Sequence, residues 1–312
     1  MKITVVFTLL ALALSGEIAR GQDEVSLWRE PSIAWRADPR SPAMGALSLD
    51  QEPQQAVASP WLADRGEGVH TSQFGTYIRE HELLVYLFYE YTVNRDNEYK
   101  PEELGFVGTR DFTAKRVDHE TLLYAAYGIT KDLMVEIESA IWTTATQTKA
   151  SQDTSAMPRH LTEQGLGDTE GQIRWRFFHE TEDLPEALVF FEAVLPLQRR
   201  KVLIGTQAYE FALEFVVTKG FSWGTLSAKF GYSYDRADKE SDFGEYAIEY
   251  VKKLSDSWRL VLSVEGSQDE VEGIVEFQWR PWPNVMIKLN NSFGITPKAP
   301  DWAPEVGIMF SF

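Results

Sequence analysis

The chain has 312 residues, contains no cysteine and carries a formal net charge of −17. The absence of cysteine excludes disulfide bonds, a lipid-modified cysteine anchor and thiol catalysis. The acidic excess disfavours nucleic-acid binding, because such binding needs basic surfaces that displace counterions from phosphates. Beyond the N-terminus no window of about 18 consecutive apolar residues occurs, so a helical membrane protein is excluded as well.

Residues 1–21 have the features of a secretory signal peptide. Lys2 precedes an apolar run over residues 3–14, and Ala19 and Gly21 are the small residues that a signal peptidase reads. We predict a mature chain that begins at Gln22, with an earlier cut after Gly16 as the alternative. The sequence therefore predicts an exported protein.

Residues 22–79 are rich in proline, alanine, serine and acidic residues, and they keep neither a helical nor a strand period for long. This composition predicts a largely irregular periplasmic extension, in which residues 33–35 or Trp61 are candidates for docking on another part of the protein. A disordered leader without function is the simpler interpretation. The pattern changes near Glu80, where the folded domain, residues 80–312, is expected to begin.

From Glu80 onward the sequence alternates apolar and polar residues with a period of two, which is typical of β-strands with one apolar face. In the last strand Val306, Ile308, Phe310 and Phe312 share the apolar face. The twelve expected strands are residues 83–94, 120–129, 133–142, 168–178, 187–197, 207–217, 223–234, 245–253, 258–265, 271–280, 285–293 and 303–312. An even strand number is what a single-chain outer-membrane barrel requires.

The connections between these strands alternate in length. The short connections are residues 130–132, 218–222, 254–257 and 281–284, with 180–186 somewhat longer. The connections between them, which are mostly longer, are residues 95–117, 143–167, 198–206, 235–244, 266–270 and 295–302. Outer-membrane barrels have short periplasmic turns and longer outer loops. We therefore predict an all-β fold, a transmembrane antiparallel up-and-down β-barrel of about 12 strands with both chain ends in the periplasm.

Aromatic residues mark the expected membrane boundary. Trp223, Trp258, Trp279 and Trp282 lie beside the short turns, where their rings would sit at the inner lipid interface. The apolar face of the last strand, with Ile308, Phe310 and Phe312, is the expected signal for the barrel-assembly machinery. Ordinary core aromatics of a β-sandwich are the alternative, which leaves the loop alternation and the terminal phenylalanine unexplained.

Charged residues alternate with the apolar ones and would face the inside of the barrel. Unpaired charges are costly in a dry sandwich core, so these residues need a wet lumen. The lumen-lining candidates are Glu136, Glu138, Arg174, Arg176, Glu192, Glu210, Glu214, Lys229, Glu249, Arg259, Glu276, Arg280 and Lys288. Two uses stay open, namely Glu and Arg pairs that brace a narrow barrel, or a net acidic conduit that disfavours anions.

No catalytic residue, metal or cofactor is expected. An outer-membrane hydrolase would need a serine beside a histidine. None of the histidines sits in a recognisable nucleophile motif; they are His70, His81, His119, His160 and His179. The acidic loop after residue 95 lacks the fixed ligand spacing of a calcium-binding loop.

Six further stretches carry recognisable motifs. They are residues 127–133 (YGITKDL), 165–168 (GLGD), 174–177 (RWRF), 245–250 (EYAIEY), 293–301 (FGITPKAPD) and 307–312 (GIMFSF). These stretches resemble the outer-membrane family named for the meta-pathway of phenol degradation, over residues 120–312. The resemblance implies a transporter-like barrel for small aromatic or other hydrophobic compounds, with no catalytic residues to carry over.

Together these features predict an outer-membrane channel for the passive uptake of small molecules. The alternatives are a closed structural or binding barrel whose outer loops contact a partner and, less favoured, an outer-membrane hydrolase. A lumen blocked by the leader or by a loop would favour the closed barrel. The expected partners are outer-membrane lipid, the barrel-assembly machinery and a small-molecule solute, with no nucleic acid.

Overall fold

The computed structural model describes residues 59–236, 239–267 and 270–312. The signal peptide and most of the extension expected before residue 59 lie outside the described residues. Within the described ranges no helix is both long and apolar enough to cross a bilayer.

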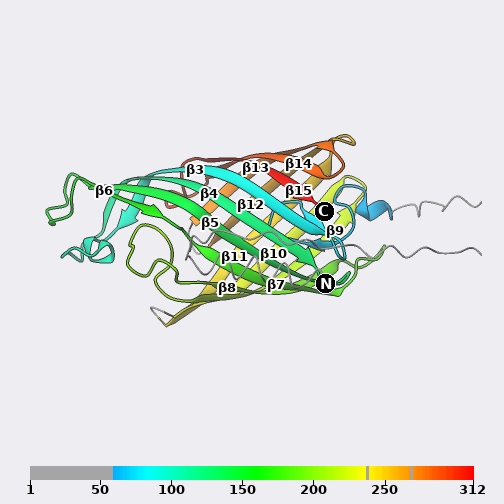
Figure 1. The fold of residues 1–312 in the computed structure, drawn as a ribbon, viewed down its shortest axis with the longest axis horizontal. Helices are drawn as coiled ribbons and strands as arrows, with labels where there is room; N and C mark the ends of the chain where they lie inside the picture. Colours follow the sequence, from blue (N-terminus) through cyan, green and yellow to red (C-terminus); the bar gives the residue numbers. More distant parts are fainter. Residues whose placement is uncertain (1–58, 237–238, 268–269) are drawn as a thin grey trace, which may run out of the picture. The chain divides into compact units, whose positions relative to one another are not determined.

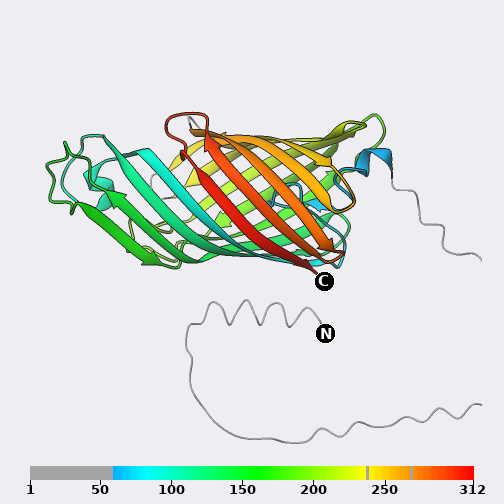
Figure 2. The ribbon, with the colours of Figure 1, turned by 90° about the horizontal axis from the view of Figure 1, so that it is seen from above.

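Twelve antiparallel strands close into a barrel, as Figure 1 and Figure 2 show. The wall runs through β3 (Leu83–Tyr99), β4 (Phe112–Gly128), β5 (Leu133–Thr148), β7 (Thr169–Phe178), β8 (Glu186–Val194), β9 (Glu210–Phe221), β10 (Gly224–Asp235), β11 (Glu240–Lys253), β12 (Trp258–Ser267), β13 (Glu270–Trp282), β14 (Val285–Gly294) and β15 (Ala303–Ser311). The last strand closes the wall on the first, from Glu305 opposite Glu90 to Ser311 opposite Leu84. The prediction of a twelve-stranded antiparallel barrel is confirmed.

One further strand, β6 (His160–Gly165), lies beside the barrel wall. It pairs with the outer half of β5, whereas β7 pairs with the half of β5 nearer the short turns. The expected loop over residues 143–167 is therefore partly strand.

Several strands extend further at the long-loop end than predicted, whereas β8 and β9 are shorter there. β3 and β4 have 17 residues each and stay paired as far as Tyr99 opposite Phe112, where a loop was expected over residues 95–117. Likewise β10 ends at Asp235 and β11 begins at Glu240, and β12 ends at Ser267 and β13 begins at Glu270. About 10 residues suffice to cross a bilayer, so β3 and β4 are long enough to project beyond it. Figure 1 shows that the barrel extends further on the β3 to β6 side. Outside lipid neither strand face has to stay apolar along its length, which is why the apolar alternation does not reveal these ends.

The wall turns its apolar face outward and its charged face inward, which is the reverse of a soluble protein. On β7, Ile173 and Trp175 are each 54% exposed on the outer face, whereas Arg174 between them is 3% exposed and faces inward. A wall that turns apolar residues outward and charges inward is stable only when hydrocarbon surrounds it. The barrel is therefore built to span a membrane.

The outer loops carry a small core of their own. Tyr99, Ala114, Ala150 and Met157 form one buried cluster, and Leu203 and Ile204 pack on Ala145 in a second. Arg116 Nη2 donates a hydrogen bond of 2.8 Å to the Leu203 carbonyl oxygen. Because Arg116 and Ala145 belong to the inner faces of β4 and β5, the loop over residues 195–209 folds against the inside of the projecting wall.

Residues 59–82 fold inside the short-turn end of the barrel, and we call them the plug segment. They contain the 3-10 turn η1 (Pro60–Leu62) and the antiparallel hairpin of β1 (Val69–His70) and β2 (Tyr77–Ile78). Gly68 has φ +127°, and a Cβ there would lie 2.4 Å from the Ile78 carbonyl oxygen, so the hairpin requires glycine at this position.

The plug segment departs from the irregular extension expected over residues 22–79. Its order comes from contacts with the lumen wall, which sequence periodicity does not report. Trp61, one of the two docking candidates, lies against the wall, with Lys219 Nζ 5.9 Å from its ring centre. The other candidate, residues 33–35, lies outside the described residues.

Candidate functional site

Ion pairs hold the base of the plug segment in the short-turn mouth of the barrel. Arg65 donates to Glu186 at 3.1 and 3.2 Å and to Glu180 at 3.0 Å, and its side chain is almost fully buried. Burial opposes the charge of Arg65, but nearby Tyr77, Glu186 and Glu180 hold the pKa of its guanidinium above the ordinary value. Asp64 pairs with Lys252 at 3.2 Å. Arg65, Glu180 and Glu186 are almost fully buried, and removing one partner of such a buried pair typically costs about 3–5 kcal/mol.

Side chains of the wall also form hydrogen bonds with the backbone at the tip of the hairpin. The Ser72 amide donates to Glu136 at 3.3 Å, and the Gly75 amide donates to Glu249 at 2.9 Å. The Phe74 carbonyl oxygen accepts hydrogen bonds from Gln278 Nε2 at 2.8 Å and from Lys288 Nζ at 3.4 Å. These partners come from β5, β11, β13 and β14, so the tip is held from several sides of the lumen.

Two inward ion pairs support the wall residues that hold the tip. Lys288 and Glu276 are fully buried and lie 3.2 Å apart. Arg174 pairs with Glu136 at 3.2 Å, and its guanidinium lies 3.9 Å from the centre of the Phe190 ring. A cation thus holds Glu136, which accepts from the Ser72 amide, and another holds Glu276, which lies beside Gln278 and Lys288.

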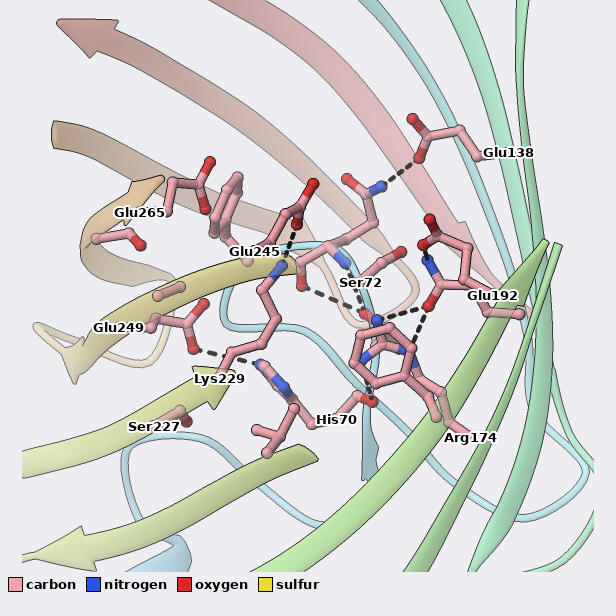
Figure 3. Close-up of a pocket in the computed structure, with 18 of the residues that line it drawn as sticks. His70, Ser72, Glu138, Arg174, Glu192, Ser227, Lys229, Glu245, Glu249 and Glu265 are labelled. Carbon is pink, nitrogen blue, oxygen red and sulfur yellow. Dashed lines mark hydrogen bonds and ion pairs between the residues drawn. The ribbon is translucent and has the colours of Figure 1, made fainter. Parts of the chain in front are cut away.

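Beyond the tip lies a cavity of about 320 Å³, which we call the acidic chamber. Plug residues 70–74 form part of its lining, and carboxylates dominate the rest: Glu90, Glu138, Glu170, Glu192, Glu245, Glu249, Glu265 and Glu305. Figure 3 shows Lys229 reaching Glu245, at 2.6 Å, and His70 reaching Glu249, at 3.3 Å. The basic side chains in the lining are His70, Lys229 and Arg174, so carboxyl groups outnumber basic groups in the chamber.

The strand register brings like charges face to face in and around this chamber. Glu90 lies opposite both Glu305 and Glu120, Glu138 lies opposite Glu170, and Glu265 lies opposite Glu272. Directly opposed like charges destabilise a sheet. Neutral donors relieve part of this repulsion, as when Gln73 Nε2 donates to Glu138 at 2.7 Å.

The thirteen lumen candidates make the following contacts, and their role in lining a conduit stays a prediction. Glu136, Arg174, Arg176 and Glu249 contact the plug segment, and Glu138 bonds Gln73. Glu192 and Lys229 line the acidic chamber, with Glu214 3.7 Å from Lys229, and Glu276 pairs with Lys288. Glu210 bonds Thr206 towards the outer end, at 2.6 Å, while Arg259 and Arg280 line the short-turn mouth.

The residues expected at the membrane boundary lie on the outer face. Trp258 and Trp279 are each 40% exposed and stack with ring centres 5.9 Å apart, and Trp223 and Trp282 are also exposed. The apolar face of β15 continues to Phe312, whose amide donates to the Leu83 carbonyl oxygen. A lipid-interface role for these tryptophans and an assembly role for Ile308, Phe310 and Phe312 stay predictions.

The residues that sequence reasoning missed belong to the plug segment or receive it, above all Arg65, His70 and Glu186. Glu186 lies at the start of β8 and bonds both Arg65 and Arg176. The available signal was the run of glycines at 66, 68 and 75, because clustered glycines mark tight turns and close backbone approach.

His70, His119, His160 and His179 contact carboxylates or hydroxyls, whereas His81, just before the first wall strand, donates its backbone amide to the Gly128 carbonyl oxygen. His179 lies 2.8 Å from Asp132 at a short turn, His119 lies 2.7 Å from the Tyr89 hydroxyl, and His160 lies 3.4 Å from the Thr148 hydroxyl. In the part of the chain that the structure describes, no group of three or more His, Asp or Glu side chains is arranged to hold a metal ion.

Comparison with known proteins gives a likeness of fold. No family model matches the sequence. No curated protein matches it either. A KdgM porin in complex with disordered oligogalacturonate is 8% identical, with a TM-score of 0.45 over 73% of this chain and 99% of that one.

Two other solved barrels give similar values. The translocator domain of the autotransporter NalP from Neisseria meningitidis is 9% identical, with a TM-score of 0.44 over 75% of this chain and 90% of that one. An active-site mutant of outer membrane phospholipase A from Escherichia coli is 12% identical, with a TM-score of 0.42 over 82% and 98%. The closed barrel and the lipid-facing belt of this chain put the protein in the outer membrane.

Proposed function

We propose that the protein is an outer-membrane channel for the passive passage of small hydrophilic solutes, cationic or neutral. In the structure the plug segment holds this channel closed. The observation that carries this proposal is the acidic chamber. Its carboxylates exceed its cations, and several of them face each other across the strand register. A lumen that only braced the wall would pair its charges. An unbalanced acidic lining instead lowers the energy of a cation inside it and repels anions.

The lining of the acidic chamber does not suit the small aromatic or hydrophobic solutes that the family resemblance implies. The large apolar side chains of the chamber among the described residues are Phe74, Phe88, Leu122, Phe190 and Val216. Carboxylates surround them, and a purely hydrophobic solute would have to strip water from these groups. A hydrophilic solute therefore fits the chamber better than an aromatic hydrocarbon.

A closed binding barrel is the second candidate, and the plug segment favours it. Arg65, Asp64 and the hairpin tip are fastened to the wall by buried contacts, and the outer loops have a core of their own. In this alternative the plug segment never leaves, and the outer loops contact a partner.

Single-channel conductance in planar bilayers separates the two candidates. The informative variant lacks residues 22–78, and its matched control lacks residues 22–58 and so keeps the plug segment. We expect the full chain and the control to give little or no current. The variant without the plug segment should give stepwise currents, with a reversal potential in a KCl gradient that reports preference for K⁺ over Cl⁻.

Two results would contradict the channel proposal. A folded variant without the plug segment that passes no current supports the closed barrel. Stepwise currents whose reversal potential reports a preference for Cl⁻ would show that a pore exists. They would contradict the role assigned to the acidic chamber.

A further inference from the structure

A second cavity of about 400 Å³ opens at the short-turn end, between the plug segment and strands β12 to β15. Its charged lining consists of Arg65, Arg79, Arg259, Arg280, Glu67 and Glu82. The cavity is therefore net positive, in a chain whose overall charge is −17. We call it the arginine pocket.

Two of the four guanidiniums already have carboxylate partners. Arg65 is held by Glu180 and Glu186, and Arg79 pairs with Glu82 at 3.1 Å. Within residues 59–236, 239–267 and 270–312, neither Arg259 nor Arg280 forms an ion pair or a side-chain hydrogen bond. Asp64, a nearby plug carboxylate, is occupied by Lys252 Nζ and by the Lys253 amide at 2.9 Å.

The register puts the two unpaired arginines on the same inner face. Arg259 lies opposite Gln278, and Arg280 follows Gln278 by two residues on the neighbouring strand. Side chains in this diagonal relation start about 7–8 Å apart, within reach of one small ligand between them. Two cations that face each other without a counterion repel, and an anion between them removes that cost.

The chemistry of the lining specifies the kind of anion. A guanidinium presents a planar fork of N–H donors that matches the oxygens of a carboxylate or phosphate. Thr76, Asn284 and Ser311 add neutral polar groups to the same cavity. Arg65 Nε is buried and has no hydrogen-bond partner.

We propose that the arginine pocket binds a small soluble oxyanion, a phosphate or a carboxylate, clamped between Arg259 and Arg280. Both side chains face the lumen and not the lipid, so the ligand enters from the aqueous phase at the short-turn end. The site lies against Gly66 of the plug segment, since a Cβ at Gly66 would be 3.6 Å from Arg259 Nη2. It does not depend on whether the barrel conducts.

Titration calorimetry of the full chain in a neutral detergent tests the proposal, with inorganic phosphate and succinate as probes at constant ionic strength. We expect saturable binding of at least one probe, weakened 10-fold or more in Arg259→Gln and in Arg280→Gln. Lys131→Gln is the matched control, because it removes an exposed cation at the same end without touching the pocket, and its affinity should equal that of the wild type. Arg259→Lys should also bind more weakly, since it keeps the charge but loses the fork.

A second measurement requires no variant. Phenylglyoxal modifies accessible arginines, and mass spectrometry of the modified peptides should show that phosphate protects Arg259 and Arg280 but not Arg95, which is exposed in an outer segment. The proposal is overturned if the wild type binds neither probe, if the Arg259→Gln, Arg280→Gln double variant binds as well as the wild type, or if chloride displaces the probe at equal concentration.

Discussion

Asp153 is a single residue on which the core of the outer loops depends. Its carboxylate accepts hydrogen bonds from the Tyr99 hydroxyl at 3.0 Å and from the Ser155 amide at 2.7 Å. Although burial opposes ionisation, these hydrogen bonds and the charge of Lys149 hold the pKa of Asp153 below its ordinary value of 3.8. A carboxyl whose pKa is lower in the folded protein stabilises the fold at neutral pH. That contribution is lost as the pH falls below 3.8 and through the native pKa.

We therefore expect amide hydrogen exchange in residues 149–159, corrected for its intrinsic pH dependence, to accelerate as the pH falls below 3.8. Asp153→Asn should show the faster exchange already at pH 7. Asp111→Asn is the control, because Asp111 is an exposed loop carboxylate whose ion pair with Lys100 is 3.7 Å long. Equal exchange in Asp153→Asn and the wild type at pH 7 would mean that other contacts hold the loop.

At the residue scale, sequence predicts the face of a side chain but not its partner. Alternation alone puts Glu136 and Arg174 on the inner face, because the period of a strand is two. Their 3.2 Å contact depends on the register of β5 against β7, in which Met134 lies opposite Arg174. Register is fixed by the closure of the whole sheet, so the opposed carboxylates of the acidic chamber could not be predicted either.

The plug segment is the element that decides whether the lumen is open. Gly68→Ala should loosen it, because the substitution strains a positive φ and brings the new methyl group against the Ile78 carbonyl. We expect more frequent channel openings in bilayers and faster trypsin cleavage after Arg65. Gly105→Ala is the matched control, since Gly105 also has a positive φ, of +80°, but no atom lies within 4 Å of its added Cβ. Identical behaviour of the two variants would mean that backbone strain at Gly68 does not matter for closure.

Elements differ in how much of them a sequence reveals. The twelve wall strands were predictable because lipid on one side and water on the other force a strict alternation over each strand. The plug hairpin has two strands of two residues each, which is too short for any period. Its order comes from side chains of distant wall strands, such as Glu136 and Glu249, so only the clustered glycines hinted at it.

At the scale of the whole molecule, the barrel depends on lipid outside and water inside, and two adjacent residues of β11 test this arrangement. Ile248 is 62% exposed on the outer face, whereas Ala247 lines the acidic chamber opposite Glu265. Ile248→Arg would force a guanidinium into hydrocarbon, at a cost of about 2–4 kcal/mol near the bilayer midplane. Ala247→Arg would put the same group among carboxylates, where its charge is neutralised.

Reversible urea unfolding from lipid vesicles, followed by tryptophan fluorescence, should therefore give a much lower free energy of unfolding for Ile248→Arg than for Ala247→Arg. In the variant without the plug segment, Ala247→Arg should also reduce the preference for K⁺, because it cancels part of the charge that attracts cations. The comparison controls for the size and charge of the new side chain, since only the face of the strand differs. Equal destabilisation of the two variants would contradict the assignment of inner and outer faces. It would also contradict the arrangement of lipid outside and water inside, which lets a chain with so many inward carboxylates fold.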